Sequence, residues 1–222
     1  MELSVENLAC RRGGRHVFTG LSFAVVPGEP MTLRGPNGAG KSTLLRTLAG
    51  FLPISAGDAR LGQASLAKSS QDMQDLVLYA GHLDAVKPAL TVTENLAFWS
   101  SLHGTKDKPV ADSALERFGL SAIAQRPAAE CSAGQRRRLG IARLLLTERP
   151  LWLLDEPTVS LDAASSALVA DLIREHAAKG GLTLVASHID LGLGAGPELC
   201  LDPEPATART APDTDPFLEG QW

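Results

Sequence analysis

The fold of this chain is decided by the stretch Gly35-Pro36-Asn37-Gly38-Ala39-Gly40-Lys41-Ser42-Thr43. It matches the phosphate-binding pattern G-x-x-x-x-G-K-S/T at every fixed position. The glycines let the backbone fold tightly, so that its amides can face phosphate oxygens with no side chain between them. Lys41 adds a positive charge near the outer phosphates, and the hydroxyl of Ser42 is a candidate Mg²⁺ ligand. The stretch therefore predicts a binding site for a nucleoside triphosphate.

The flanking sequence has the context that this pattern requires. Residues 31–33 are typical of a short strand, and strong helix formers follow Thr43. A loop between a strand and a helix presents the amides and the positive end of the helix dipole to an anion. A chance glycine-rich turn would need neither neighbour, so we prefer the phosphate-binding interpretation.

Length and composition indicate a globular chain. Its 222 residues suffice for one large domain or two smaller subdomains, and 44% of them are hydrophobic against 21% charged. No apolar run approaches the roughly 18 residues of a membrane span. The start at Met1 lacks the basic and apolar regions of a signal peptide, so we expect a cytoplasmic location. The three cysteines, Cys10, Cys131 and Cys200, are too far apart for a metal motif and odd in number.

Charge is distributed unevenly along the chain. Residues 1–150 carry 18 Lys and Arg against 13 Asp and Glu, whereas residues 151–222 carry 3 against 12. The basic part includes the phosphate-binding stretch, and most other charges are expected on solvated surface. We expect no nucleic-acid partner. Residues 205–222 are acidic and proline-rich, which predicts a loose tail.

Periodicity predicts an α/β fold with a helical insertion. An edge strand is expected at residues 3–9, and further strands at 21–25, 31–33, 58–61, 76–79, 151–154, 182–186 and 199–201. Helices are expected at residues 41–49, 92–102, 110–118, 134–146 and 163–178. The pattern is mainly helical from 84 to 147. We therefore expect a nucleotide-binding core at about 1–83 and 148–201, with a helical subdomain at about 84–147.

A second group of polar residues follows the apolar run at 151–154. Such a run is typical of a strand buried on both faces, which would deliver Asp155 to the edge of the sheet beside the phosphate loop. There Asp155 can hold Mg²⁺, and Glu156 can polarise an attacking water. An apolar strand ending in two acids is common by itself. Behind a phosphate loop it favours a catalytic interpretation.

A second anion site is predicted at Ser132-Ala133-Gly134-Gln135. Ser132 can cap the helix that follows, and Gly134 leaves its backbone bare. Two phosphate sites on one chain suggest that they face each other across a dimer.

These motifs together resemble the ATP-binding subunits of ABC transporters. GPNGAGKST resembles their Walker A motif, CSAGQ at 131–135 their signature, and LWLLDEPT at 151–158 their Walker B motif. Ser160-Leu161-Asp162 resembles the D-loop and Ser187-His188 the switch histidine. The resemblance implies a P-loop NTPase of the ABC type over residues 1–204. It would have a RecA-like core, an antiparallel β subdomain and a helical subdomain.

The resemblance also implies roles for individual residues. Glu156 would be the general base, and His188 would contact the γ-phosphate and link it to Glu156. ATP and Mg²⁺ would bind between Walker A of one subunit and residues 132–135 of the other, in a head-to-tail homodimer. Asp162 would contact the opposing subunit, although it can equally cap the helix that starts at 163.

Some positions depart from the family pattern. Arg12 stands near the place of the aromatic residue that stacks on adenine, and arginine can stack too, so base stacking there stays open. Cys131 and Ala133 replace Leu and Gly in the signature, and both are small enough to leave the anion site intact. Gly81-His82 replaces the usual glutamine.

Residues 79–96 resemble one subfamily, the ATP-binding subunits of the cytochrome c maturation system, which are haem exporters. The resemblance implies membrane subunits of the CcmB and CcmC type and a place on the cytoplasmic face of the inner membrane. His82 would sense nucleotide and touch the membrane partner, or it is a polar linker residue. An exporter of another cargo and a non-catalytic nucleotide-gated module remain alternatives.

We expect no direct haem binding, because the remaining histidines stand singly and the chain has no Cys-Pro pair. Phe98, Trp99 and Leu102 recur at helical spacing. They are expected in the core of the helical subdomain rather than in the groove for the partner.

Overall fold

The computed structural model describes residues 1–103 and 108–203. The predicted acidic tail at 205–222 lies outside the described residues. Among the helices that are described, none is long and apolar enough to cross a membrane.

The N-terminal part forms an antiparallel sheet of β1 (Leu3–Arg12), β2 (Arg15–Val25), β4 (Ala56–Leu61) and β5 (Ala64–Ser65), in the order β2-β1-β4-β5. The expected edge position of the first strand is wrong, because β1 pairs with β2 on one side and β4 on the other. Its alternation at Leu3 and Val5 reflects one buried face, and a register shift after Val5 places Leu8 in the core as well. Alternation reports burial and carries no information on the number of neighbouring strands.

The second sheet is parallel and has the order β6-β7-β8-β3-β9. Its strands are β6 (Val77–Ala80), β7 (Leu151–Asp155), β8 (Leu182–Ala186), β3 (Met31–Arg34) and β9 (Glu198–Cys200). Every residue of β7 and β8 is buried, which explains their unbroken apolar runs. Because the strands are parallel, their carboxyl ends share one edge of the sheet. The loops after β3, β7 and β8 therefore meet there.

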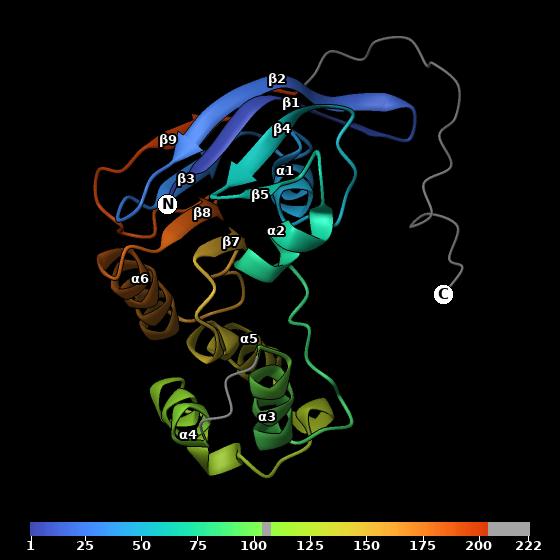
Figure 1. The fold of residues 1–222 in the computed structure, drawn as a ribbon. Coiled ribbons are helices and arrows are strands. Elements are labelled where there is room, and N and C mark those ends of the chain that lie inside the picture. Colours follow the sequence, from blue (N-terminus) through green and yellow to red (C-terminus); the bar gives the residue numbers. More distant parts are fainter. Residues whose placement is uncertain (104–107, 204–222) are drawn as a thin grey trace.

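Helix α1 (Lys41–Leu48) lies between the two sheets (Figure 1). Its residues Leu44, Leu45 and Leu48 are fully buried and join the two sheets in one hydrophobic core. Helix α2 (Ser70–Leu76) was not predicted from the sequence, because Met73 is its only buried residue. Ser69 caps this helix by accepting a hydrogen bond from the Asp72 amide.

The predicted helical insertion comprises α3 (Val92–His103), α4 (Lys108–Arg117) and α5 (Ala133–Ala142), gathered at the end of the molecule away from the antiparallel sheet (Figure 1). Short 3₁₀ turns occupy Ser121–Ile123, Ala128–Glu130 and Arg143–Leu146. The helix expected at 134–146 thus ends as an α-helix at Ala142. A second core joins this insertion to the parallel sheet and to α6 (Ala163–Ala178), whose bounds match the prediction.

Candidate functional site

The loop between β3 and α1 requires glycine for both conformation and space. Gly35, Gly38 and Gly40 have φ values of 142°, 84° and 96°, a region that other residues rarely adopt. A Cβ on Gly35 would lie 2.3 Å from the carbonyl oxygen of Leu201, and one on Gly40 2.6 Å from a methyl of Val17. No side chain caps the first turn of α1. Its amides are therefore suited to an anionic ligand.

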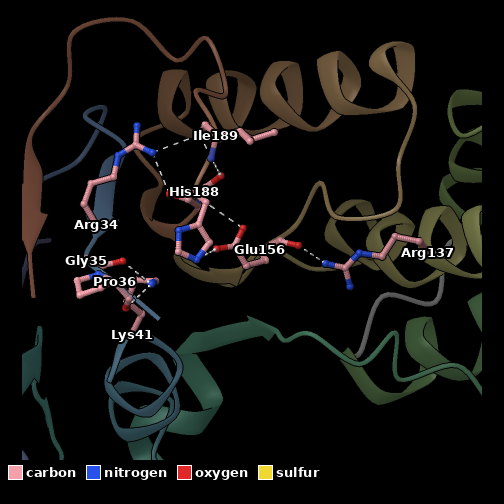
Figure 2. A network of polar contacts seen from close by, with 9 residues as sticks. Arg34, Gly35, Pro36, Lys41, Arg137, Glu156, His188 and Ile189 are labelled. Carbon is pink, nitrogen blue, oxygen red and sulfur yellow. Dashed lines mark hydrogen bonds and ion pairs between the residues drawn. The ribbon is translucent and has the colours of Figure 1, made fainter. Parts of the chain in front are cut away.

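Lys41 opens α1 and turns back over the loop. Its Nζ donates hydrogen bonds to the carbonyl oxygens of Gly35 at 2.7 Å and Pro36 at 3.1 Å (Figure 2). These bonds hold the ammonium at the mouth of the loop, and the side chain is largely buried. Its charge thus lies beside the amides, where an anion would gain from both.

A pocket of about 390 Å³ adjoins this loop. One wall consists of the loop and the start of α1, and the opposite wall consists of Asp155, Glu156 and His188. Val17, on β2, completes the lining. The fold therefore brings the predicted phosphate loop together with the acids that follow β7 and the histidine that follows β8. Gly35, Pro36 and Ala39 shape the loop without lining the pocket.

Asp155 is the last residue of β7, and only 3% of its surface is exposed. It accepts a hydrogen bond at 3.3 Å from the hydroxyl of Tyr79, on β6. That hydroxyl also accepts a hydrogen bond from Arg46 Nε, at 3.3 Å. Burial raises the pKa of Tyr79, so its hydroxyl stays protonated and can donate to the carboxylate. Tyr79 is a site residue that the sequence analysis missed.

Glu156 follows β7 in a left-handed conformation with φ of 49°. Its amide donates to the Ala186 carbonyl at 2.9 Å. Its carboxylate faces His188: Oε1 lies 3.3 Å from His188 Nε2, and Oε2 accepts from the His188 amide at 3.4 Å (Figure 2). Oε1 is buried and receives no well-aligned hydrogen bond from the described residues. This oxygen can accept a proton or a hydrogen bond from a ligand in the pocket.

Arg34 holds the loop that carries His188. Its Nη1 donates to the carbonyl oxygens of Ser187 at 2.9 Å and Ile189 at 3.3 Å (Figure 2). Ser187 is buried, and its hydroxyl oxygen lies within hydrogen-bonding distance of both the Ile189 amide and the Ile189 carbonyl oxygen, which stabilises the turn. This role could not be predicted from the sequence, because Arg34 precedes the phosphate loop and belongs to no fixed motif position.

The second predicted anion site lies at the start of α5. Ser132 and Gln135 form a reciprocal capping box, with Gln135 N donating to Ser132 Oγ at 3.2 Å and Ser132 N to Gln135 Oε1 at 2.9 Å. Ser132 and Ala133 are exposed, and none of the residues 132–135 lines the pocket beside Lys41. A single chain therefore does not unite the two anion sites.

The loop before α6 adjoins this helix start. A Cβ on Gly134 would lie 3.6 Å from the Ser160 carbonyl oxygen. Asp162 caps α6 by accepting a hydrogen bond from Ser165 N at 2.7 Å. That hydrogen bond lowers the pKa of the Asp162 carboxyl. The capping role considered for Asp162 is thus present, and its exposed side chain leaves a contact with a second subunit open.

His82 and Arg12 lie outside the pocket that holds Lys41. His82 is exposed and lines a separate groove of about 590 Å³, between the core and the helical subdomain. Arg12 pairs with Arg15 across the hairpin.

The apolar residues of α3 do not all lie in the core, contrary to expectation. Of the three residues expected in the core, Leu102 and Phe98 are 58% and 38% exposed, and Trp99 alone packs inward, under the guanidinium of Arg143. The fully buried apolar residues of α3 are Val92 and Leu96. Periodicity identified the helix but did not indicate which of its apolar residues would be covered.

The two sheets, the helical insertion and the pocket at the phosphate loop define this protein as an ATP-binding cassette. A family model described as ABC transporter matches residues 18–159. The chain is 52% identical to the cytochrome c biogenesis ATP-binding export protein CcmA of Cereibacter sphaeroides, over 98% of both chains. It is 51% identical to the CcmA of Ruegeria pomeroyi, over 97% of this chain and 98% of the relative. The chain belongs to this CcmA family of ABC transporter ATP-binding proteins.

Solved structures agree with this fold. An ATP-binding subunit of an ABC transporter superimposes with a TM-score of 0.82 at 25% identity, over 90% of this chain and 86% of that chain. The ADP conformation of another ABC transporter cassette gives a TM-score of 0.74 at 25% identity, over 90% and 87% of the two chains.

Proposed function

We propose that this chain hydrolyses ATP to power a membrane complex for cytochrome c biogenesis, in haem export or release of a haem chaperone. One observation carries the ATPase part: a single pocket joins Lys41 and Ser42 to Asp155, Glu156 and His188. The names of the relatives, which match almost the full chain, support the biological assignment.

In this proposal the phosphates of ATP lie on the loop amides and on Lys41. Glu156 takes a proton from a water molecule, whose oxygen attacks the γ-phosphorus. The bond from that phosphorus to the β,γ-bridging oxygen breaks, and ADP and phosphate leave. Phosphoryl transfer depends mainly on positioning and on neutralising charge, which this residue set can supply. His188 orients the Glu156 carboxylate and reaches toward the γ-phosphate.

The donor set fits Mg²⁺, which we propose is held by Ser42 and Asp155. Both offer oxygen ligands, and Asp155 is buried at the pocket. No three His, Cys, Asp or Glu side chains cluster as a metal site within residues 1–103 and 108–203. Mg²⁺ in nucleotide sites commonly uses one or two protein oxygens together with phosphates and water. The ion would neutralise charge on the transferring phosphoryl group.

We propose that the working unit is a head-to-tail homodimer. The capped start of α5 is exposed and lies outside the Lys41 pocket of its own chain. A second copy would bring its residues 132–135 to the γ-phosphate and its Asp162 to the opposing subunit. ATP would then join the copies and drive closure.

The groove that contains His82 is the proposed docking surface for the membrane subunits, which we take to be of the CcmB and CcmC type. Phe51, Leu83 and Leu102 line it with exposed fractions of 48%, 80% and 58%. Exposed apolar side chains around a groove of this size are typical of a protein interface. Docking there would hold the chain on the cytoplasmic face of the inner membrane without a haem ligand of its own.

The test is complementation in a bacterium whose own CcmA-type subunit has been deleted. We expect the wild-type chain to restore covalently haem-stained cytochromes c, and the variant Glu156→Gln to fail at equal expression. A chain that hydrolyses ATP normally but restores no cytochrome c would serve another cargo. A chain that restores cytochrome c without any ATPase activity would be a nucleotide-gated module.

A further inference from the structure

Arg137 connects the helical subdomain to the catalytic strand from a buried position. It lies on α5, is 4% exposed, and its Nη2 donates to the Glu156 carbonyl oxygen at 2.5 Å (Figure 2). Its Nη1 lies within hydrogen-bonding distance of the carbonyl oxygens of Gly81 at 3.2 Å and His82 at 3.4 Å, and of Asp84 Oδ1 at 3.1 Å. One guanidinium thus contacts both the segment beside the docking groove and the residue proposed as general base.

A buried guanidinium is an unfavourable way to fill space. Taking its charge out of water is costly, and Asp84, which is 28% exposed, offsets the cost only in part. Its Nε is buried without an acceptor among the described residues. An apolar side chain of similar volume would avoid both penalties. The advantage of arginine here therefore lies in the groups that it holds.

The backbone of Glu156 depends on such contacts to keep its conformation. A left-handed conformation is unfavourable for a residue with a side chain, and persists where the surroundings fix it. The Glu156 amide is fixed by Ala186, and its carbonyl oxygen by Arg137. These two contacts fix the peptide units on both sides of the Glu156 Cα and so the direction of its side chain, whose Oε1 faces His188 at 3.3 Å.

We infer that Arg137 is a positioning residue for ATP hydrolysis: it orients the Glu156 carboxylate through the Glu156 carbonyl oxygen and links it to residues 81–84. This inference rests on the proposed role of Glu156. Arg137 touches neither the pocket nor the Lys41 loop, so it acts on turnover and leaves nucleotide binding unchanged.

The experiment compares Arg137→Met and Arg137→Lys with Arg138→Gln in the full chain. Arg138 is the next residue of α5 and also donates to a backbone carbonyl, that of Phe118, so Arg138→Gln is the matched control. We expect kcat for ATP to fall about 10-fold to 100-fold in Arg137→Met, because small misplacements of a catalytic group have effects of this size. KM and the dissociation constant of a fluorescent ATP analogue should stay within about 2-fold of wild type, since Lys41 and its loop are untouched. The control should keep its kcat.

Two further variants separate orientation from general stability. Asp84→Asn removes the ion pair but keeps the donation to Glu156, so its kcat should stay close to wild type. Arg137→Met combined with Glu156→Gln should show the single-turnover rate of Glu156→Gln alone, because Arg137 then has no base to orient. Arg137→Lys keeps a charge but cannot donate to residues 81–84 and to the Glu156 carbonyl oxygen at once, so this variant should fold and still lose turnover. Circular dichroism gives the folded fraction used to normalise each rate.

An unchanged kcat in Arg137→Met or, if that variant does not fold, in Arg137→Lys would overturn the inference. A loss of kcat matched by an equal loss of nucleotide affinity, or an additive loss in the double variant, would overturn it as well. If Glu156→Gln itself turns over ATP normally, the proposed role of Glu156 fails. If only that variant is inactive while the Arg137 variants are active, the inference about Arg137 fails alone.

Discussion

The hydroxyl of Tyr79 donates a hydrogen bond to Asp155 across 3.3 Å, and the rings of Tyr79 and Phe51 form a T-shaped contact with 5.7 Å between centroids. Tyr79 and Phe51 both line the proposed docking groove, whereas Asp155 lines the nucleotide pocket. One side chain therefore connects the proposed docking groove with the proposed Mg²⁺ ligand.

Tyr79→Phe keeps the ring contact and removes only the hydroxyl. We expect the Mg²⁺ concentration for half-maximal ATPase activity to rise about 10-fold, within the range usual for loss of a group that orients a metal ligand. The measurement is a Mg²⁺ titration at saturating ATP, with Phe51→Leu as the control for packing. An unchanged Mg²⁺ requirement would limit Tyr79 to a packing role.

Lys41→Ala should weaken nucleotide binding at least about 10-fold, because it removes the cation from beside the loop amides, where a charge-assisted hydrogen bond is worth more than 1.4 kcal/mol. Titration with a fluorescent ATP analogue measures the change. Lys68→Ala, at an exposed lysine away from the pocket, is the control and should bind as wild type. Equal affinity in both variants would place the triphosphate elsewhere.

Gly35→Ala and Gly180→Ala separate strain from collision. Both glycines have positive φ, but a Cβ on Gly180 meets no atom within 4 Å, whereas one on Gly35 meets the Leu201 carbonyl oxygen. We expect Gly180→Ala to lower the free energy of unfolding by about 1 to 2 kcal/mol, and Gly35→Ala by about 1 to 3 kcal/mol more. Urea unfolding measures both. Equal losses would show that the loop after β3 can move away from Leu201.

The two-copy site can be tested by mixing variants. Glu156→Gln should lower turnover about 100-fold or more, since general bases typically contribute 10²-fold to 10⁴-fold. It should also elute as an ATP-dependent dimer in size-exclusion chromatography with light scattering. Adding Ser132→Arg to Glu156→Gln should abolish that dimer while each chain still binds ATP. A dimer that persists with Ser132→Arg would contradict the head-to-tail arrangement.

His176 predicts a pH dependence of stability. Its ring stacks on Trp152 with centroids 3.9 Å apart, and burial lowers the pKa of His176 below its ordinary value of 6.5, assisted by Lys179 and partly opposed by hydrogen bonds. The unfolded chain therefore binds a proton that the folded chain disfavours. This contribution to stability is complete above pH 6.5 and is lost as the pH falls below that value.

His176→Phe keeps the stacking and removes the titration. Its melting temperature should depend less on pH between 7 and 5 than that of the wild type. At pH 7 the variant should also melt at a lower temperature than the wild type. It loses the hydrogen bond to Pro150, which contributes about 1 kcal/mol to the free energy of unfolding. If the melting temperatures of the variant and the wild type change equally with pH over this range, His176 does not cause the pH dependence.

Much of the fold could be predicted because its signals are local. The glycines of the loop at 35–40, the buried runs of β7 and β8, and the single amphipathic run of α6 each reflect the conformation or burial of neighbouring residues. The same signals failed where they were weak. Helix α2 buries only Met73. The alternating pattern of β1 indicates one buried face but does not indicate that the strand pairs with a neighbour on each side.

The sequence by itself determined the class of the protein, the order of most of its elements and the residue types that can bind a triphosphate. Those features depend on local spacing and on backbone conformation, which a motif records. The tertiary structure alone decided that Tyr79 reaches Asp155, that Arg34 holds the loop of His188, and that Arg137 reaches Glu156. These pairs are far apart in the chain, and they meet because parallel strands end at one edge and α5 packs against it.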